Sequence, residues 1–255
     1  MFAPLLVQHS VTLTYPRQTG IRRRVNEVED VLTKAFPTGY SFPQIVPVPE
    51  EIDPEVPRLL FGSSHGFNQI LVSQIAVMLS VTYSPDWQET PGRGVQYAKE
   101  RLPVLHDIVG VVAPGARPAF TGISTTLRIP SASNEASIRS VAGLFARDVY
   151  EGEVNELAVR WSKNVRRDYF CNLNVQTVSQ WPEVEGQPLS VTRLPLGSAI
   201  ATGVEVVCDY NDRMAFNEQP NYSTSMAVGM ELLDHGLAEA QAVARRLVSA
   251  TGELK

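Results

Sequence analysis

Apolar and polar residues alternate with a period of two in several segments, and this pattern constrains the fold of the chain more than any other feature. A period of two places successive side chains on opposite faces of a strand. The first such segment has its apolar face at Leu5, Val7, His9, Val11, Leu13 and Tyr15. The alternation recurs in 75–83, 123–129, 157–161, 169–175 and 204–210. We therefore predict half-buried strands in these segments.

The predicted elements follow the same order twice. A strand, an amphipathic helix, three strands and a second helix fill residues 1–113, and the same series fills residues 114–255. Strands that follow strands directly favour antiparallel pairing over a doubly wound parallel sheet. The sequence thus predicts an α+β protein with two similar β-α-β-β-β-α halves, an internal duplication of element order. Whether the two largely antiparallel sheets join into one is left open.

Prolines interrupt the pattern in two places. Residues 37–57 contain six prolines and an acidic cluster, so we predict a long surface crossing without regular structure. Pro103 falls within the second predicted helix, which begins near Pro91, and is predicted to kink or split it.

Composition excludes some classes of protein. The net charge of -5 over 255 residues gives no overall field that would attract nucleic acid or an anionic membrane. No segment approaches the roughly 20 apolar residues of a membrane helix, and the first residues lack the basic start of a signal peptide. The two cysteines are too few for a disulfide scaffold. We expect a cytoplasmic protein without membrane contact.

The letters Gly62-Ser63-Ser64-His65-Gly66 match the G-x-S-x-G motif of the α/β-hydrolase nucleophile elbow. In that motif the serine precedes a helix whose N-terminus faces the oxyanion. Here 67–72 reads as a strand, so a hairpin turn explains the same letters. We predict Phe61 and Ile70 on paired strands with Gly66 at the bend, and no catalytic residue.

No metal or cofactor site is predicted. The four histidines, His9, His65, His106 and His235, lie far apart in the sequence, and neither H-x-x-x-H nor C-x-x-C occurs. The segment 208–213 loosely imitates a calcium loop but lacks its glycine and its distal glutamate.

Arg93 lies between two glycines at the start of the second helix, where free N–H groups and the helix dipole favour a phosphate. Thr90 as N-cap and Pro91 as the first helical residue also explain this segment as an ordinary helix start. Arg93 is therefore one candidate for anion binding.

Arg22, Arg23 and Arg24 lie in the first turn of the first helix, where the dipole disfavours cations. This placement favours a functional cause such as a phosphate or an acidic partner, and these three residues join Arg93 as anion-binding candidates. The alternative is a solvated face in which Arg23 pairs with Glu27. Nucleic-acid binding would further require that the pairs at 166–167 and 245–246 share a face with them.

Short motifs give a resemblance. A Pro4 before the first strand, "LLFGSSHG", "LSVTYSPDW" and a final helix opened by Leu233-Asp234-His235 resemble a sporadically distributed family of uncharacterised bacterial proteins. The resemblance implies no catalytic residue, and it suggests Asp234 and His235 as functional candidates. The alternative is that Asp234 caps the closing helix and His235 is exposed in its first turn. The family implies a setting beside mobile or defence genes.

These observations favour a non-enzymatic adaptor that binds another protein, in a bacterial defence or toxin-control operon, and that can form a homo-oligomer. One alternative is an enzyme or sensor for a phosphate-bearing ligand. The other is a nucleic-acid-binding module, which the charge does not favour.

Overall fold

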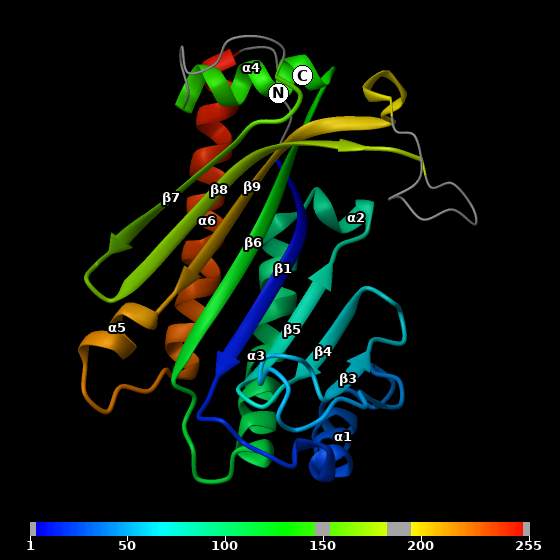
Figure 1. Cartoon of the computed structure of the whole chain (residues 1–255), viewed down its shortest axis with the longest axis vertical. Coiled ribbons are helices and arrows are strands. Elements are labelled where there is room, and N and C mark those ends of the chain that lie inside the picture. The colour runs from blue at the N-terminus through cyan, green and yellow to red at the C-terminus, as the bar shows by residue number, and fades with distance from the viewer. Residues whose placement is uncertain (1–3, 146–153, 183–194, 252–255) are drawn as a thin grey trace.

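The computed structural model describes residues 4–145, 154–182 and 195–251. The described strands form one sheet of nine strands in the order β2-β3-β4-β5-β1-β6-β9-β8-β7 (Figure 1). Every neighbouring pair is antiparallel, so the predicted α+β class is confirmed. The strands are β1 (Leu5–Thr14), β2 (Gln44–Ile45), β3 (Leu59–Gly62), β4 (Asn68–Val72), β5 (Ala76–Thr82), β6 (Phe120–Ser131), β7 (Ala158–Val165), β8 (Tyr169–Gln180) and β9 (Ala201–Asn211).

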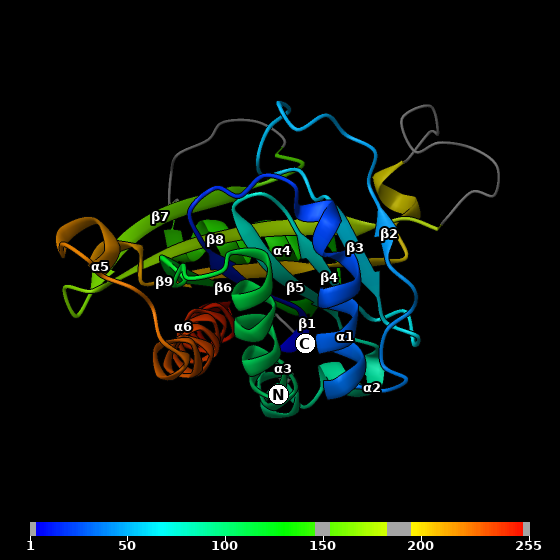
Figure 2. The same cartoon turned by 90° about the horizontal axis from the view of Figure 1, so that it is seen from below.

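The long helices pack on one face of this sheet, below the strands in Figure 2. Alternate strand residues point into the layer between sheet and helices, as the burial of every second residue of β6 shows. This layer is the hydrophobic core, and it runs through both halves of the chain. The helices are η1 (Ile21–Arg24), α1 (Val25–Ala35), α2 (Pro85–Gln88), α3 (Pro91–Val112), α4 (Asn134–Phe145), η3 (Leu196–Ser198), α5 (Arg213–Glu218) and α6 (Met226–Thr251).

The opposite face of the sheet is polar and faces the viewer in Figure 1. It presents Ser10 and Ser124 near its middle and an ion pair between Arg128 and Glu205, whose Nη2 and Oε1 atoms are 2.6 Å apart. The crossing that includes Glu55 and Pro57 covers part of it. Within the described residues, no helix has both the length and the apolar content needed to cross a membrane.

Strands β1 and β6 pair at the centre and join the two halves into one sheet, which settles the question that the sequence left open. Their register runs from Leu5 opposite Arg128 to Thr14 opposite Phe120. Outward from this pair the order is β5, β4, β3 on one side and β9, β8, β7 on the other. The two-residue β2 pairs outside β3, so the prediction that 37–57 lacks regular structure is wrong at this point. Apart from β2, element order and neighbour order match between the halves, while duplication of the sequence stays a prediction.

Pro103 does not split its helix, because α3 continues from Pro91 to Val112. The neighbours Leu102, Val104 and Leu105 are buried, and α3 packs on both α6 and β1. Burial of this face outweighs the loss of one backbone hydrogen bond at proline. The prediction of a split is therefore wrong.

Candidate functional site

The segment around Ser64 forms the predicted hairpin turn. Phe61 lies opposite Ile70 in the β3–β4 pair, and Gly66 has a φ of 75°, the left-handed conformation that glycine adopts without strain. The Ser64 hydroxyl is exposed and donates a hydrogen bond of 2.8 Å to the carbonyl of Thr38. Among the described residues, no histidine ring bonds a serine, threonine or cysteine side chain. Ser64 is thus a turn residue.

A pocket of about 250 Å³ opens beside this turn, and we call it the aromatic pocket. Its residues come from the turn, from the end of β5 and from the two helices that follow. They are Ser63, His65, Phe67, Asn68, Val81, Thr82, Tyr83, Ser84, Trp87 and Tyr97. The one-turn helix α2 reverses the chain after β5, and α3 then returns over the sheet.

Three rings form the wall of the aromatic pocket. Tyr83 and Trp87 stack with ring centroids 6.2 Å apart and planes at 16°. Trp87 meets Tyr97 edge to face at 5.6 Å, a favoured aromatic geometry. Phe67 at the rim is 51% exposed. The lining of the pocket is therefore mainly apolar.

Asn68 lines the pocket and holds Tyr97 through a hydrogen bond. This residue begins β4 and is 7% exposed. Its Nδ2 donates a hydrogen bond of 2.5 Å to the Tyr97 hydroxyl, while its buried Oδ1 has no hydrogen-bond partner. Because Oδ1 is covered by protein atoms, Asn68 positions the Tyr97 ring through Nδ2 and offers no acceptor to a ligand.

Two guanidinium groups lie against the pocket rings. Arg93 lies 3.7 Å from the centroid of Trp87, and Arg101 lies 3.3 Å from the centroid of Tyr97. Arg93 is exposed and forms no ion pair with a described residue. The predicted anion-binding candidate Arg93 is thus placed at the edge of an aromatic site, with its charge available.

Buried hydrogen bonds hold Tyr83 in place. Its hydroxyl donates to the carbonyl of Gly94 at 2.9 Å and lies 3.1 Å from Nδ1 of His9. Because the hydroxyl proton is used on Gly94, His9 must carry its proton on Nδ1, and its buried Nε2 is left unpartnered. Desolvation lowers the pKa of His9 to about 4, so the ring is neutral near pH 7.

Gly94 is required where α3 approaches Tyr83 and Leu6. A Cβ atom at this position would lie 2.9 Å from Cζ of Tyr83, closer than such atoms approach in folded proteins. We therefore expect Gly94→Ala to lower the free energy of unfolding by about 2 kcal/mol, because the clash outweighs the gain of about 1 kcal/mol in helix propensity.

Urea denaturation at pH 7 measures this effect. Gly92→Ala is the matched control, since nothing lies within 4 Å of the added Cβ there and stability should be kept or slightly raised. Equal stability of both variants would show that α3 does not need the close approach.

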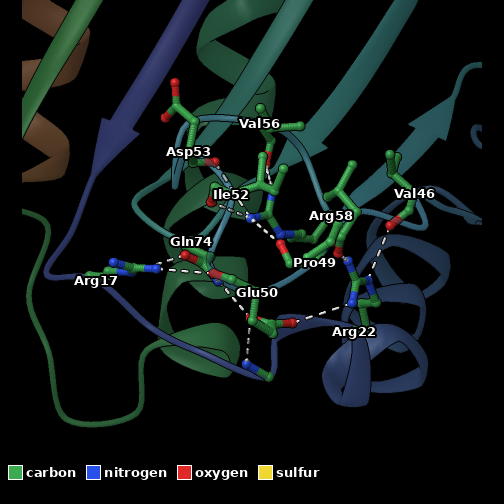
Figure 3. A network of polar contacts seen from close by, with 12 residues as sticks. Arg17, Arg22, Val46, Pro49, Glu50, Ile52, Asp53, Val56, Arg58 and Gln74 are labelled. Carbon is green, nitrogen blue, oxygen red and sulfur yellow. Dashed lines mark hydrogen bonds and ion pairs between the residues drawn. The ribbon is translucent and has the colours of Figure 1, made fainter.

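Internal contacts occupy two arginines of the run at 22–24, and Figure 3 shows those of Arg22. Arg22 donates hydrogen bonds to the carbonyls of Val46 and Val48 and lies 3.4 Å from the carboxylate of Glu50. Arg24 pairs with Glu27 at 2.8 Å, so the predicted pairing of Arg23 with Glu27 is wrong. The one-turn helix η1 turns Arg23 outward instead, where it is exposed.

Glu50 occupies the position near the start of the first helix at which an anion was expected. Its carboxylate accepts hydrogen bonds from the Gln74 side chain at 2.5 Å and from the backbone N–H of Gly20 at 3.4 Å. Desolvation acts to raise the pKa of Glu50, but these donors and Arg22 together hold it below its ordinary value. The protein thus supplies its own carboxylate to Arg22.

Arg58 is the centre of the same network and was not predicted from the sequence. The side chain is fully buried. Its Nη1 donates to the Val56 carbonyl at 2.5 Å, and its Nη2 lies within 3.0 to 3.4 Å of the carbonyls of Pro49, Ile52 and Asp53 (Figure 3). One guanidinium therefore holds the proline-rich crossing in its folded path.

Asp234 and His235 lie inside α6, which begins at Met226. Asp234 therefore does not cap the helix; its carboxylate pairs with Lys99 of α3 at 2.6 Å. His235 is half-buried rather than exposed, with Nε2 3.0 Å from Glu231 and its ring 5.9 Å from that of Tyr210. Both alternatives based on a helix start at this point are wrong, and both residues link α6 to its neighbours.

The basic pairs are distributed over the molecule. Arg166 has a φ of 54° at the β7–β8 turn and pairs with Glu231 near the start of α6. Arg245 lies fourteen positions further along this helix, which is about 21 Å at the rise of an α-helix. The run at 22–24 belongs to the other half of the sheet (Figure 1). The three sets of arginines therefore do not form one continuous basic surface.

The described residues contain no group of three or more histidine, cysteine or acidic side chains arranged for a metal ion. Cys171 and Cys208 are free, buried thiols on β8 and β9 with their sulfur atoms 3.8 Å apart. No protein-family model matches the chain, and no curated protein matches it. The resemblance suggested by the short motifs therefore stays a prediction.

Proposed function

We propose that the protein is a non-enzymatic binding protein that holds another protein at the aromatic pocket. The observation that carries this proposal is the pocket itself, with three stacked or edge-on rings and, at its edge, a guanidinium without an ion pair to a described residue. Tryptophan, tyrosine and arginine are the residue types that dominate the energetics of protein interfaces.

Exposed apolar side chains near the turn support a protein partner. Phe42 is 86% exposed, Ile45 is 51% exposed, and Phe67 lies on the pocket rim. Residues 40–45 run alongside β3, with Tyr40 bridged to Ser63 and Ile45 paired with Leu59. Apolar groups gathered at one sheet edge are typical of an interaction surface rather than of a solvated one.

The chemistry of the same region supports binding rather than catalysis. Ser64 donates only to backbone carbonyls, and the exposed His65 has no carboxylate that would orient its ring among the described residues. A nucleophile, a base and an orienting group are needed together for acyl transfer. We place the partner among proteins encoded beside this one, in the defence or toxin-control setting that the resemblance implies.

Variants of the exposed aromatic residues Phe67 and Phe42 test the proposal. The protein is expressed in its native host with its neighbouring genes, isolated, and its co-eluting chains are identified by mass spectrometry. Phe67→Ser and Phe42→Ser should each reduce the recovered partner by tenfold or more, because an exposed aromatic anchor contributes about 2 kcal/mol to binding.

Ile200→Ser provides the control. Ile200 is 68% exposed and immediately precedes β9, in the other half of the sheet, so this variant should retain the partner at the wild-type level. Recovery of the chain alone, or equal retention by all three variants, would contradict the proposal.

A further inference from the structure

We infer that the open face of the sheet binds a short apolar peptide with free termini, in a hollow that is separate from the aromatic pocket. The hollow is lined by outward-facing residues of β1, β4, β5 and β6, by Glu55 and Pro57 of the crossing and by Arg213 of α5, and we call it the sheet hollow. Its volume is about 510 Å³, and it shares no lining residue with the aromatic pocket. This inference therefore goes beyond the proposed function.

Half-buried side chains of neighbouring strands form the floor of the sheet hollow. Ala76 of β5 lies opposite Thr14 of β1, which in turn lies opposite Phe120 of β6. In the next outward-facing row, Met78 lies opposite Thr12. All five residues line the hollow, on the face of the sheet that the long helices leave open. A mainly apolar concavity of this volume is typical of ligand sites.

Polar groups end this floor and also lie within it. In the following outward-facing row, Ser80 lies opposite Ser10, and Ser10 lies opposite Ser124, so the apolar surface does not continue along these strands. Inside the hollow, the hydroxyl groups of Thr12 and Thr14 form no hydrogen bond with a described residue. Each hydroxyl can donate and accept, so both are available to the backbone amide groups of a peptide.

Two opposite charges flank the sheet hollow. Arg213 lies over Phe120, with its guanidinium carbon 5.5 Å from the centre of that ring. Glu55 follows Pro54, whose carbonyl accepts a hydrogen bond of 3.0 Å from the backbone N–H of Gln74 at the β4–β5 turn. The side chains of Arg213 and Glu55 are exposed, and neither forms an ion pair with a described residue.

This pair of charges favours a ligand that carries both signs. A free carboxylate would pair with Arg213, and a free ammonium group would pair with Glu55. A ligand with one charge would be attracted by one of these side chains and repelled by the other. A peptide with free termini supplies both groups, and its apolar side chains match the floor between them.

The spacing of the strands sets the length of the ligand. Only β1 lies between β5 and β6, so Ala76 and Phe120 are two strand spacings apart, which is about 10 Å. Arg213 lies on the β6 side of the hollow and Glu55 on the side of the β4–β5 turn. Three residues in an extended conformation span at most roughly 10 Å. We therefore expect a tripeptide that lies across β1.

Tripeptides with free and blocked ends provide the test. The full-length protein is titrated with Ala-Leu-Ala, with its N-acetylated form and with its C-terminal amide, and binding is followed by amide chemical shifts in NMR spectra. We expect each blocked peptide to bind about fivefold more weakly than the free peptide, because each loses one charged contact at an exposed site. The shifts should lie in β1, β5 and the start of β6.

Charge-removing variants assign each end of the peptide to one side chain. Arg213→Gln should bind the free peptide and the amide equally, while it still discriminates against the acetylated form. Glu55→Gln should show the reverse, with equal binding of the free and acetylated peptides and continued discrimination against the amide. Both side chains are exposed, so neither variant is expected to affect folding.

Glu51→Gln and Arg23→Gln are the matched controls. Both residues are exposed and neither lines the sheet hollow, so these variants should bind all three peptides as the wild-type protein does. The inference is overturned if Ala-Leu-Ala does not bind at millimolar concentration, if the wild-type protein binds the three peptides equally, or if the shifts lie outside the hollow. Because the aromatic pocket is a separate site, such a result would leave the proposed function standing.

Discussion

Arg58→Met should lower the free energy of unfolding by about 3 kcal/mol, which corresponds to a fall in melting temperature of about 6 to 12 °C. Methionine fills a similar space, so the loss arises mainly from the carbonyl groups that the guanidinium now satisfies. Those of Val56 and Ile52, at 2.5 and 3.0 Å, would be left without this donor inside the folded crossing. Thermal and urea unfolding at pH 7 measure the change.

Two further variants separate charge from geometry. Arg58→Lys keeps the cation but cannot reach carbonyls on several sides at once, so its stability should lie between wild type and Arg58→Met. Arg23→Ala removes an exposed arginine from the neighbouring helix and should change stability by no more than about 0.5 kcal/mol. A stable Arg58→Met variant would mean that water can replace the guanidinium at these carbonyls.

Acid should destabilise the protein through His9 by about 3 kcal/mol between pH 6.5 and pH 4. The pKa of His9 is about 4 in the folded protein, because of desolvation, against 6.5 in an exposed histidine. In this window the unfolded chain binds a proton at His9 that the folded chain does not, so the free energy of unfolding falls as the pH falls. Well above pH 6.5 both states are neutral at this ring, and the effect vanishes.

His9→Phe identifies this contribution, since other groups also titrate in acid. Phenylalanine keeps a ring in the core, while Tyr83 retains its hydrogen bond to the Gly94 carbonyl. Urea unfolding at several pH values between 7 and 4 should give a smaller decrease in the variant than in wild type, by about 3 kcal/mol over the whole window. Parallel curves for the two proteins would show that His9 is not buried as described.

The strands and their pairing were predictable because the information is local. Alternation identifies a buried face within a few residues, and the short connection at 63–67 makes β3 and β4 a hairpin, so the register of Phe61 and Ile70 follows. The joining of the two sheets through β1 and β6 was not predictable, because a strand shows the same alternation of apolar and polar residues at an edge and at the centre of a sheet.

The aromatic pocket depends on contacts between distant segments. Tyr83 and Trp87 lie four residues apart, and this spacing was the one available signal of a shared surface. Asn68 meets Tyr97 only because α3 returns over the sheet. The contacts of Arg58 were not predictable for the same reason, since its carbonyl partners lie in a crossing whose prolines indicate no particular path.

The start of α6 was misplaced because local propensity conflicts with packing. Gly229 disfavours a helix, and the apolar pattern is clearest from Leu233 onward. In the structure a Cβ at 229 would lie 2.7 Å from Cδ2 of Leu102, so glycine permits α6 to pack closely on α3. Tertiary contact therefore extends the helix back to Met226 and places Asp234 in its interior.

The central pairing of β1 with β6 also has a consequence for synthesis on the ribosome. Strand β1 is among the first segments to emerge. One of its edges can pair with β5 once residue 82 has been made, but the other has no partner until residue 131 has been made. During this interval the nascent chain presents ten residues of open strand edge, the structure through which chains associate wrongly. The rate of translation through 83–131 is therefore expected to set how much newly made protein aggregates before the sheet closes.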